Sequence, residues 1–143
     1  MIVITASGCS TGAPPDPDSG NDQPVERQQW EAAALADYRF DFQQQCFCVQ
    51  EQVQPVTIEV RAGAISRVVS RETGDDVAAS EGLRWYTVAD LFAVIADARE
   101  RGVDPLVVRY DPQLGYPVHI EAGSLAADAG IIYTASNLQP LLR

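Results

Sequence analysis

The chain has 143 residues, a formal net charge of −10 and an apolar content of 46%. A chain of this length can bury one substantial core but is short for two, so we expect one domain. Its basic residues are all arginines and form no cluster, which argues against nucleic acid as a partner. The excess of acidic residues is typical of a solvated, soluble surface.

The first residues resemble the end of a bacterial lipoprotein signal. In ITASGCSTG, small residues lead into Cys9, the position at which such signals carry the lipid. We therefore predict that Cys9 is lipidated and becomes the mature N-terminus. Ala6 stands where Leu is usual, and the preceding segment is short and lacks basic residues, so residues 1–9 are interpreted as a truncated signal that begins upstream of Met1. The alternative is a cytosolic protein with an apolar start.

Residues 10–23 consist mainly of Pro, Asp, Gly, Ser and Asn. Such a segment buries too little apolar surface to offset the entropy of ordering, so we expect a disordered tether. The folded domain is then residues 24–143. It is expected to open with a helix in which Trp30, Ala34 and Tyr38 share one face and which leads directly into the first strand. Trp30 is interpreted as a core anchor.

Alternating apolar residues predict antiparallel strands over residues 38–69. A period of two is typical of a strand with one buried face. In the first two strands these residues are Tyr38, Phe40, Phe42, Val56, Ile58 and Val60. Gly63 supplies the positive φ of a tight hairpin turn, and Ile65, Val68 and Val69 continue as a third strand. We expect a meander.

The apolar residues of the first strand are even-numbered up to Phe42, but the next ones, Phe47 and Val49, are odd-numbered. One explanation is a bulge near residues 43–45 that brings Phe47 and Val49 onto the core face. The other is that Cys46 and Cys48 occupy that face and Phe47 points away. In both cases the two cysteines share one face.

Residues 85–102 predict a second helix. Thr87 has the N-cap position and Asp90 follows three residues later, as in a capping box. Tyr86 and Leu91 have the spacing of a hydrophobic staple. One apolar face comprises Val88, Leu91, Phe92, Ile95 and Ala98. This face is expected to pack on the sheet, and the helix is expected to end before Gly102.

Two further strands are predicted over residues 106–110 and 117–121. The loop between them reads DPQLGYP. Asp111 and Pro112 favour the start of a turn, and Gly115 allows an unusual backbone angle. We therefore expect a rigid loop.

The last apolar run, residues 131–135, is expected to add an edge strand. His119 alternates with Val118 and Ile120, so it should lie on the opposite face of its strand. Together these elements predict a single α+β domain. Its antiparallel sheet has about five to six strands, with an N-terminal helix and a middle helix packed on it.

The order of these motifs resembles that of an uncharacterised family of bacterial lipoproteins, domain of unknown function 6174. The resemblance covers roughly Gln29 to Leu141. It is carried by Trp30, Tyr38, Phe40, Cys46-Phe47-Cys48, the YTVADLF segment, Tyr110-Asp111-Pro112, Gly115-Tyr116-Pro117, Asp128 and Asn137-Leu138. It implies a bacterial protein of one small domain, often anchored by lipid, and no particular activity.

The leading functional hypothesis is a non-enzymatic domain of the cell envelope. It would be exported and anchored through Cys9 at the cell membrane or the outer membrane, where it binds another envelope protein or a small ligand. We expect a monomer without a cofactor. Aromatic and turn residues are the candidate contacts, since aromatic side chains bring large contact area at low entropy cost. They are Tyr110, Asp111, Gly115, Tyr116 and Pro117.

The C-x-C pair supports an alternative based on thiol, disulfide or metal chemistry. On a regular strand, Cα atoms two residues apart are separated by about 6.5–7 Å, so a bridge between Cys46 and Cys48 requires a bend. We nevertheless predict this disulfide, because exported thiols tend to oxidise. A metal site would need a further ligand, for which His119 is the only imidazole.

The sequence gives little support for an enzyme. It contains no G-x-S-x-G, phosphate-binding loop or H-E-x-x-H motif. Chemistry by a pair of carboxylates stays open, because Asp41, Glu59 or Asp111 could meet in space.

Overall fold

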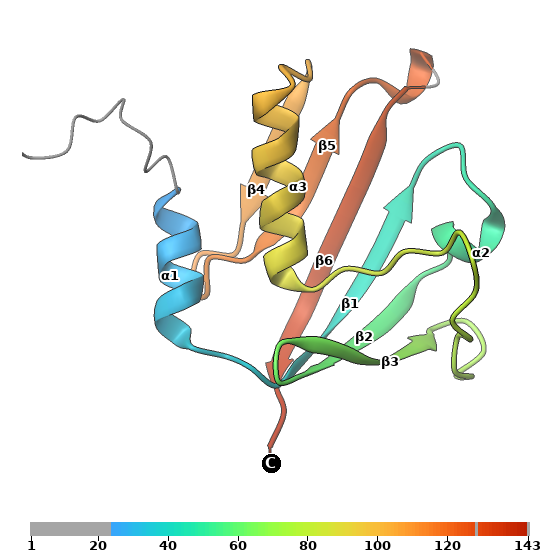
Figure 1. The fold of residues 1–143 in the computed structure, drawn as a ribbon, viewed down its shortest axis with the longest axis vertical. Coiled ribbons are helices and arrows are strands. Elements are labelled where there is room, and N and C mark those ends of the chain that lie inside the picture. Colours follow the sequence, from blue (N-terminus) through green and yellow to red (C-terminus); the bar gives the residue numbers. More distant parts are fainter. Residues whose placement is uncertain (1–23, 128, 143) are drawn as a thin grey trace, which may run out of the picture.

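The computed structural model describes residues 24–127 and 129–142 (Figure 1). They form a six-stranded antiparallel sheet in the order β3-β2-β1-β6-β5-β4. The helical elements are α1 (Val25–Ala33), α2 (Gln50–Val53), α3 (Val88–Glu100) and the 3-10 helix η1 (Leu125–Ala127). The strands are β1 (Tyr38–Gln45), β2 (Val56–Arg61), β3 (Ala64–Ser70), β4 (Leu106–Tyr110), β5 (Pro117–Ala122) and β6 (Ile131–Pro140). The predicted α+β class and antiparallel sheet are confirmed.

The sheet consists of two meanders joined at its centre. Strands β1, β2 and β3 form one meander and β4, β5 and β6 the other, and β1 pairs with β6 between them. The chain crosses from edge strand β3 to edge strand β4 through α3 (Figure 1). The prediction of an edge strand at residues 131–135 is therefore wrong. Strand β6 has ten residues and lies at the centre, because it pairs on both sides.

The core lies on the face of the sheet against which α1 and α3 pack (Figure 1). Even-numbered residues of β1 and β2 point into it, as their alternation predicts, and Phe40, Val56 and Ile58 have no exposed surface. Full burial of such side chains contributes about 1.5–3 kcal/mol each. The opposite, open face carries the odd-numbered and more polar residues of these two strands, which is typical of an antiparallel sheet with one solvated side.

A register shift occurs where β1 meets β6, and not at the predicted position. Arg39 pairs with Gln139 but Asp41 pairs with Ser136, so β6 has one extra residue here. Asn137 has a φ of 54°, a left-handed conformation that asparagine tolerates. Strand β1 itself keeps its alternation up to its end at Gln45.

Phe47 and Val49 lie outside the core, with 71% and 60% of their surfaces exposed. Of the two explanations for the change of parity, the bulge near residues 43–45 that brings them onto the core face is wrong, because β1 ends before Cys46. The two cysteines accordingly lie in a bend beyond the strand and not on its core face.

Helix α1 is shorter than the sequence pattern predicts. It ends at Ala33, and Ala34 adopts a left-handed conformation with a φ of 50°. Tyr38 therefore belongs to β1 and not to the face of the helix. Trp30 is 8% exposed and contacts Tyr38 edge to face, with ring centroids 5.1 Å apart, which confirms its role as core anchor.

Helix α3 has the predicted start and the predicted buried face. Thr87 Oγ1 accepts a hydrogen bond from the Asp90 amide at 3.1 Å, and Asp90 Oδ2 accepts one from the Thr87 amide at 2.9 Å. This is the complete capping box. The Val88 amide donates to the Tyr38 hydroxyl at 3.0 Å. Burial raises the pKa of Tyr38 to about 12, so this hydroxyl stays neutral at physiological pH.

The loop between β4 and β5 attaches α1 to the sheet. Asp111 Oδ2 accepts hydrogen bonds from the Gln113 and Leu114 amides at 3.0 and 2.7 Å, which forms the predicted turn. Gln29 Nε2 of α1 donates to the carbonyl oxygens of Pro112 and Gln113 at 3.1 and 2.6 Å. The middle of α1 is therefore tied to the turn of this hairpin.

Gly115 lies in close contact with α1. Its φ is +80°, and a Cβ atom here would overlap the carbonyl oxygen of Glu26. Gly74 has a similar φ of +77° but open space around it. We expect Gly74→Ala to lower the free energy of unfolding by about 1 kcal/mol and Gly115→Ala by about 2–4 kcal/mol, measured by urea denaturation. Equal losses would contradict the close contact.

Candidate functional site at the Cys46–Cys48 loop

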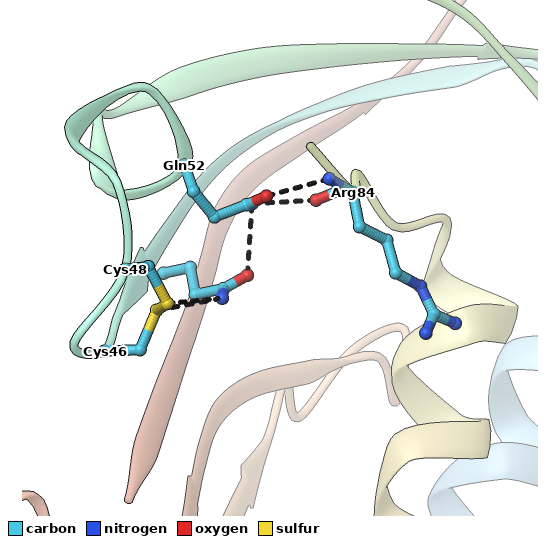
Figure 2. The surroundings of a disulfide bond; sticks show 5 residues. Cys46, Cys48, Gln52 and Arg84 are labelled. Atoms are coloured by element: carbon cyan, nitrogen blue, oxygen red, sulfur yellow. Dashed lines mark hydrogen bonds between the residues drawn. A yellow bond between two sulfur atoms is a disulfide. The ribbon is translucent and has the colours of Figure 1, made fainter. Parts of the chain in front are cut away.

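The candidate site lies where the chain leaves β1 and enters α2 (Figure 2). The Cα atoms of Cys46 and Cys48 are 5.2 Å apart, closer than in a regular strand, and their sulfur atoms are at disulfide distance. The bend that a C-x-C bridge requires is present over residues 46–48. Cys48 is exposed and Cys46 is half-buried, so the bond can be reached from solvent.

Two buried glutamines connect this loop to the rest of the fold. Gln44 and Gln52 are each 5% exposed. Gln44 Nε2 donates to Cys46 Sγ at 3.1 Å, and Gln44 Oε1 accepts from Gln52 Nε2 at 3.3 Å. Gln44 Nε2 also lies 3.9 Å from Cys48 Sγ. One amide therefore touches both sulfur atoms of the bridge.

Gln52 continues the network to the segment before α3 (Figure 2). Its Nε2 donates to the Arg84 carbonyl oxygen, and its Oε1 accepts from the Arg84 amide, both at 2.8 Å. The Arg84 guanidinium lies 5.0 Å from the centre of the Tyr86 ring, and Tyr86 contacts Tyr133 edge to face at 5.2 Å. Burial raises the pKa of Tyr133. The disulfide loop is thus linked to the aromatic core.

Sequence reasoning missed the two glutamines. Gln44 is even-numbered, like the residues of β1 that face the core, and this position indicates that its side chain is buried. Gln52 gives no such signal, because its role depends on the path of the segment that holds Arg84. Fully hydrogen-bonded polar networks of this kind fix one arrangement of neighbouring segments.

An apolar surface borders the loop, which we call the Phe47 surface. A hollow of about 330 Å³ is lined by Gln43, Gln45, Cys46, Phe47, Val53 and Leu125. None of these residues carries a charge, although 21% of the chain is Asp, Glu or Arg. Large apolar side chains that stay exposed beside a hollow are typical of interaction sites.

The five predicted contact residues lie elsewhere, around the β4–β5 loop. Gly115, Tyr116 and Pro117 are buried, and Tyr116 packs against Trp30 with ring centroids 6.3 Å apart. Tyr110 and Asp111 are half-buried. Tyr116 thus packs against α1, whereas Tyr110 stacks on Phe92 of α3 with ring centroids 6.2 Å apart. The role of the five residues in binding stays a prediction.

The other candidate residues do not converge. His119 lies on β5 with its Nε2 3.6 Å from Glu121 Oε2. Asp41 accepts a hydrogen bond from Thr57 at 2.8 Å and pairs with Arg71 at 3.6 Å. Within residues 24–127 and 129–142, no group of three or more His, Cys, Asp or Glu residues is placed to hold a metal ion.

The predicted lipidation site, Cys9, lies outside the described residues. Among the helices of the described chain, none has both the length and the apolar character needed to cross a membrane.

The fold and the loop define the class of the protein: a small α+β domain with an open six-stranded sheet and a C-x-C bridge at the end of a central strand. The family of unknown function DUF6174 matches residues 24–140. The chain therefore belongs to this family, which confirms the resemblance seen in its sequence. No curated protein and no solved structure matches the chain.

We expect Cys46→Ser and Cys48→Ser to lower stability by similar amounts. A bridge that closes so short a loop restricts the unfolded chain only slightly, so the expected loss is about 1–2 kcal/mol in each variant. Thermal unfolding without reductant measures this loss. Equal melting temperatures for the wild type and both variants would show that the bridge does not stabilise the fold.

Proposed function

We propose that this protein is a non-enzymatic domain of the bacterial cell envelope that binds another envelope protein through the Phe47 surface. A lipid on Cys9 would hold it at the membrane. The observation that carries the proposal is the 71% exposure of Phe47, an aromatic side chain placed between two cysteines at disulfide distance. Export and anchoring rest on the signal-like sequence around Cys9.

The geometry of the loop favours tight binding of a partner through Phe47. The bridge joins the residues on either side of Phe47 and restricts the backbone between them. The loop therefore loses little conformational entropy when a partner binds. Aromatic residues at the centre of an interface often carry most of its binding energy. Val49, which is 60% exposed, extends the apolar area beyond the loop.

The chemistry of this surface indicates the kind of partner. It is uncharged on a chain with a net charge of −10, so it fits an apolar and uncharged segment. The exposed amides of Gln43 and Gln45 can donate to and accept from the backbone of an extended peptide. We therefore propose an apolar, extended segment of another envelope protein as the partner.

Residues 10–23, for which the sequence predicts a tether, lie outside the described residues. A flexible chain of that length would have a root-mean-square span of about 20 Å and would set the reach of the Phe47 surface. Such a tether would keep the domain close to the membrane, and this would raise the effective concentration of any partner anchored there.

Photo-cross-linking in the native cell tests the surface. We expect a photoreactive phenylalanine analogue at position 47 of the full chain to give a discrete adduct with one envelope protein. The same analogue at position 107 should give none, because Val107 is 39% exposed but does not line the hollow beside Phe47.

The partner identified in this way is then purified and its affinity measured. We expect Phe47→Ser to weaken binding at least about tenfold, as for an interface hot spot, whereas Val107→Ser leaves it unchanged. Phe47→Ser should keep the melting temperature, since the side chain is exposed. Affinity equal to the wild type for Phe47→Ser, or no discrete adduct at position 47, would refute the proposal.

A second candidate function is thiol–disulfide exchange, and the contact between Gln44 and Cys46 favours it. An external thiolate would attack the exposed Cys48 sulfur and form a mixed disulfide. The electron pair of the broken bond would leave with Cys46 as a thiolate. Gln44 Nε2, 3.1 Å from Cys46 Sγ, is placed to donate a hydrogen bond to that negative charge.

The rate of reduction by glutathione distinguishes this candidate. We expect Gln44→Met, which removes the donor, to slow exchange about tenfold, while Gln45→Met at the neighbouring exposed position has no effect. Both variants are first shown to retain the disulfide and the wild-type fold. Equal rates for the three proteins would exclude a role of Gln44 in exchange.

A further inference from the structure

The strand that leads to the Phe47 surface has room to continue. Strand β1 ends at Gln45, which pairs with Ile132 of β6. Strand β6 begins one residue earlier, at Ile131, which pairs with Ala122 of β5 but with no residue of β1 in the described chain. The edge of β6 therefore leaves a place for one further residue of β1.

The disulfide bond prevents this extension. In the register of β1 and β6, Cys46 is the residue that would lie opposite Ile131. An extended strand separates the Cα atoms of residues two positions apart by about 6.5–7 Å. The Cα atoms of Cys46 and Cys48 are only 5.2 Å apart. The bridge thus holds residues 46–48 in a bend and ends β1 at Gln45.

The bend also determines where the Phe47 ring lies. This side chain is 71% exposed, although it lines the hollow of about 330 Å³ together with Gln43 and Gln45. Gln43 and Gln45 are odd-numbered residues of β1 and lie on the open face of the sheet. If β1 continued through position 47, the alternation of a strand would place the Phe47 ring on the same side, over the hollow.

The far wall of the hollow offers apolar contacts to a ring in that position. It includes Val53 of α2 and Leu125 of η1, and both side chains are half-buried. A ring that covers them would remove its own apolar surface and theirs from water, which is favourable. In the oxidised protein the bend keeps the Phe47 ring from this contact.

The glutamine network would keep the base of the loop in place (Figure 2). Gln44 Oε1 accepts a hydrogen bond from Gln52 Nε2, and Gln52 holds the backbone of Arg84 through two hydrogen bonds of 2.8 Å. None of these three bonds involves a sulfur atom, so they do not depend on the bridge. A change on reduction can therefore stay within residues 46–49.

We propose that the Cys46–Cys48 bridge is a redox switch of the Phe47 surface, an inference that rests on the proposed binding function. The oxidised loop presents Phe47 to the partner. In the reduced protein, β1 extends through Cys46 and Phe47, and the Phe47 ring covers the hollow. Reduction thereby closes the binding surface.

A protein dithiol is the reductant of this step. Its first thiolate attacks Cys48 Sγ and forms a mixed disulfide, and the electron pair of the broken bond leaves on Cys46 Sγ, which takes a proton. The second thiolate of the reductant then attacks the reductant's own sulfur in the mixed disulfide. Cys48 leaves as a thiolate and is protonated. Two electrons and two protons have passed to the cysteines, and the reductant has become a disulfide.

Fluorine NMR of the full chain tests the switch without a partner. A trifluoromethyl phenylalanine is placed at position 47, and a soluble paramagnetic agent broadens its signal according to its exposure to solvent. We expect strong broadening in the oxidised protein and the loss of at least about half of it after reduction with dithiothreitol, because the ring leaves the water. The same label at position 107 should show no change, since Val107 does not line the hollow.

Leu125→Gln and Ala126→Gln form the matched pair of variants. Both residues lie in η1, but only Leu125 lines the hollow. We expect Leu125→Gln to keep position 47 exposed after reduction, because a polar wall offers the ring no apolar contact, and Ala126→Gln to close like the wild type. The double variant Cys46→Ser, Cys48→Ser should show the closed state with and without reductant.

Equal broadening at position 47 before and after reduction would overturn the switch, as would equal closure of Leu125→Gln and Ala126→Gln. A parallel change at position 107 would also overturn it, because it would show a general rearrangement.

The partner found by cross-linking gives a separate readout. Reduction of the wild type should weaken its affinity at least about tenfold, since only the open form binds, and an unchanged affinity would overturn the regulation. If no partner is found, the proposed binding function fails, whereas the fluorine signal alone still decides whether the ring closes over the hollow.

Discussion

The pairing of β1 with β6 is the interaction on which the structure depends. It is the only strand contact between the two meanders of the described chain, and it places Phe42 beside Ala135 and Gln44 beside Tyr133 in the core. Both helices pack on the face that this pairing creates (Figure 1). Without it, the two meanders would be separate three-stranded sheets, and no single apolar face would span all six strands.

The Cys46–Cys48 loop and the β4–β5 loop lie on opposite sides of this centre (Figure 1). Strand β1 extends beyond its pairing with β2, which ends at Phe42, and its last residues carry the bridge away from the packed core. The β4–β5 loop ties α1 to the other half through Gln29. The hollow beside Phe47 forms where the first meander meets the second, because its lining includes both Val53 of α2 and Leu125 of η1.

Much of this fold follows from sequence patterns, and the exceptions have clear causes. The alternation in β1 and β2, the face of α3 and the capping box at Thr87 are local signals, and local signals were sufficient there. Strand β6 was not recognised in full, because Asn137 interrupts its register and its solvent-facing side is polar. Gln44 occupies a core position with a polar side chain, and the contact of Gln52 with Arg84 depends on the path of a distant segment, which no local pattern encodes.

The central pairing also constrains when the domain can form during synthesis. Tyr38 pairs with Pro140, so β1 can pair with β6 only after all the other strands have been synthesised. Contacts of such sequence separation form slowly, since a long loop must close first. The core of this domain is therefore completed only when β6 has been synthesised, after the other five strands.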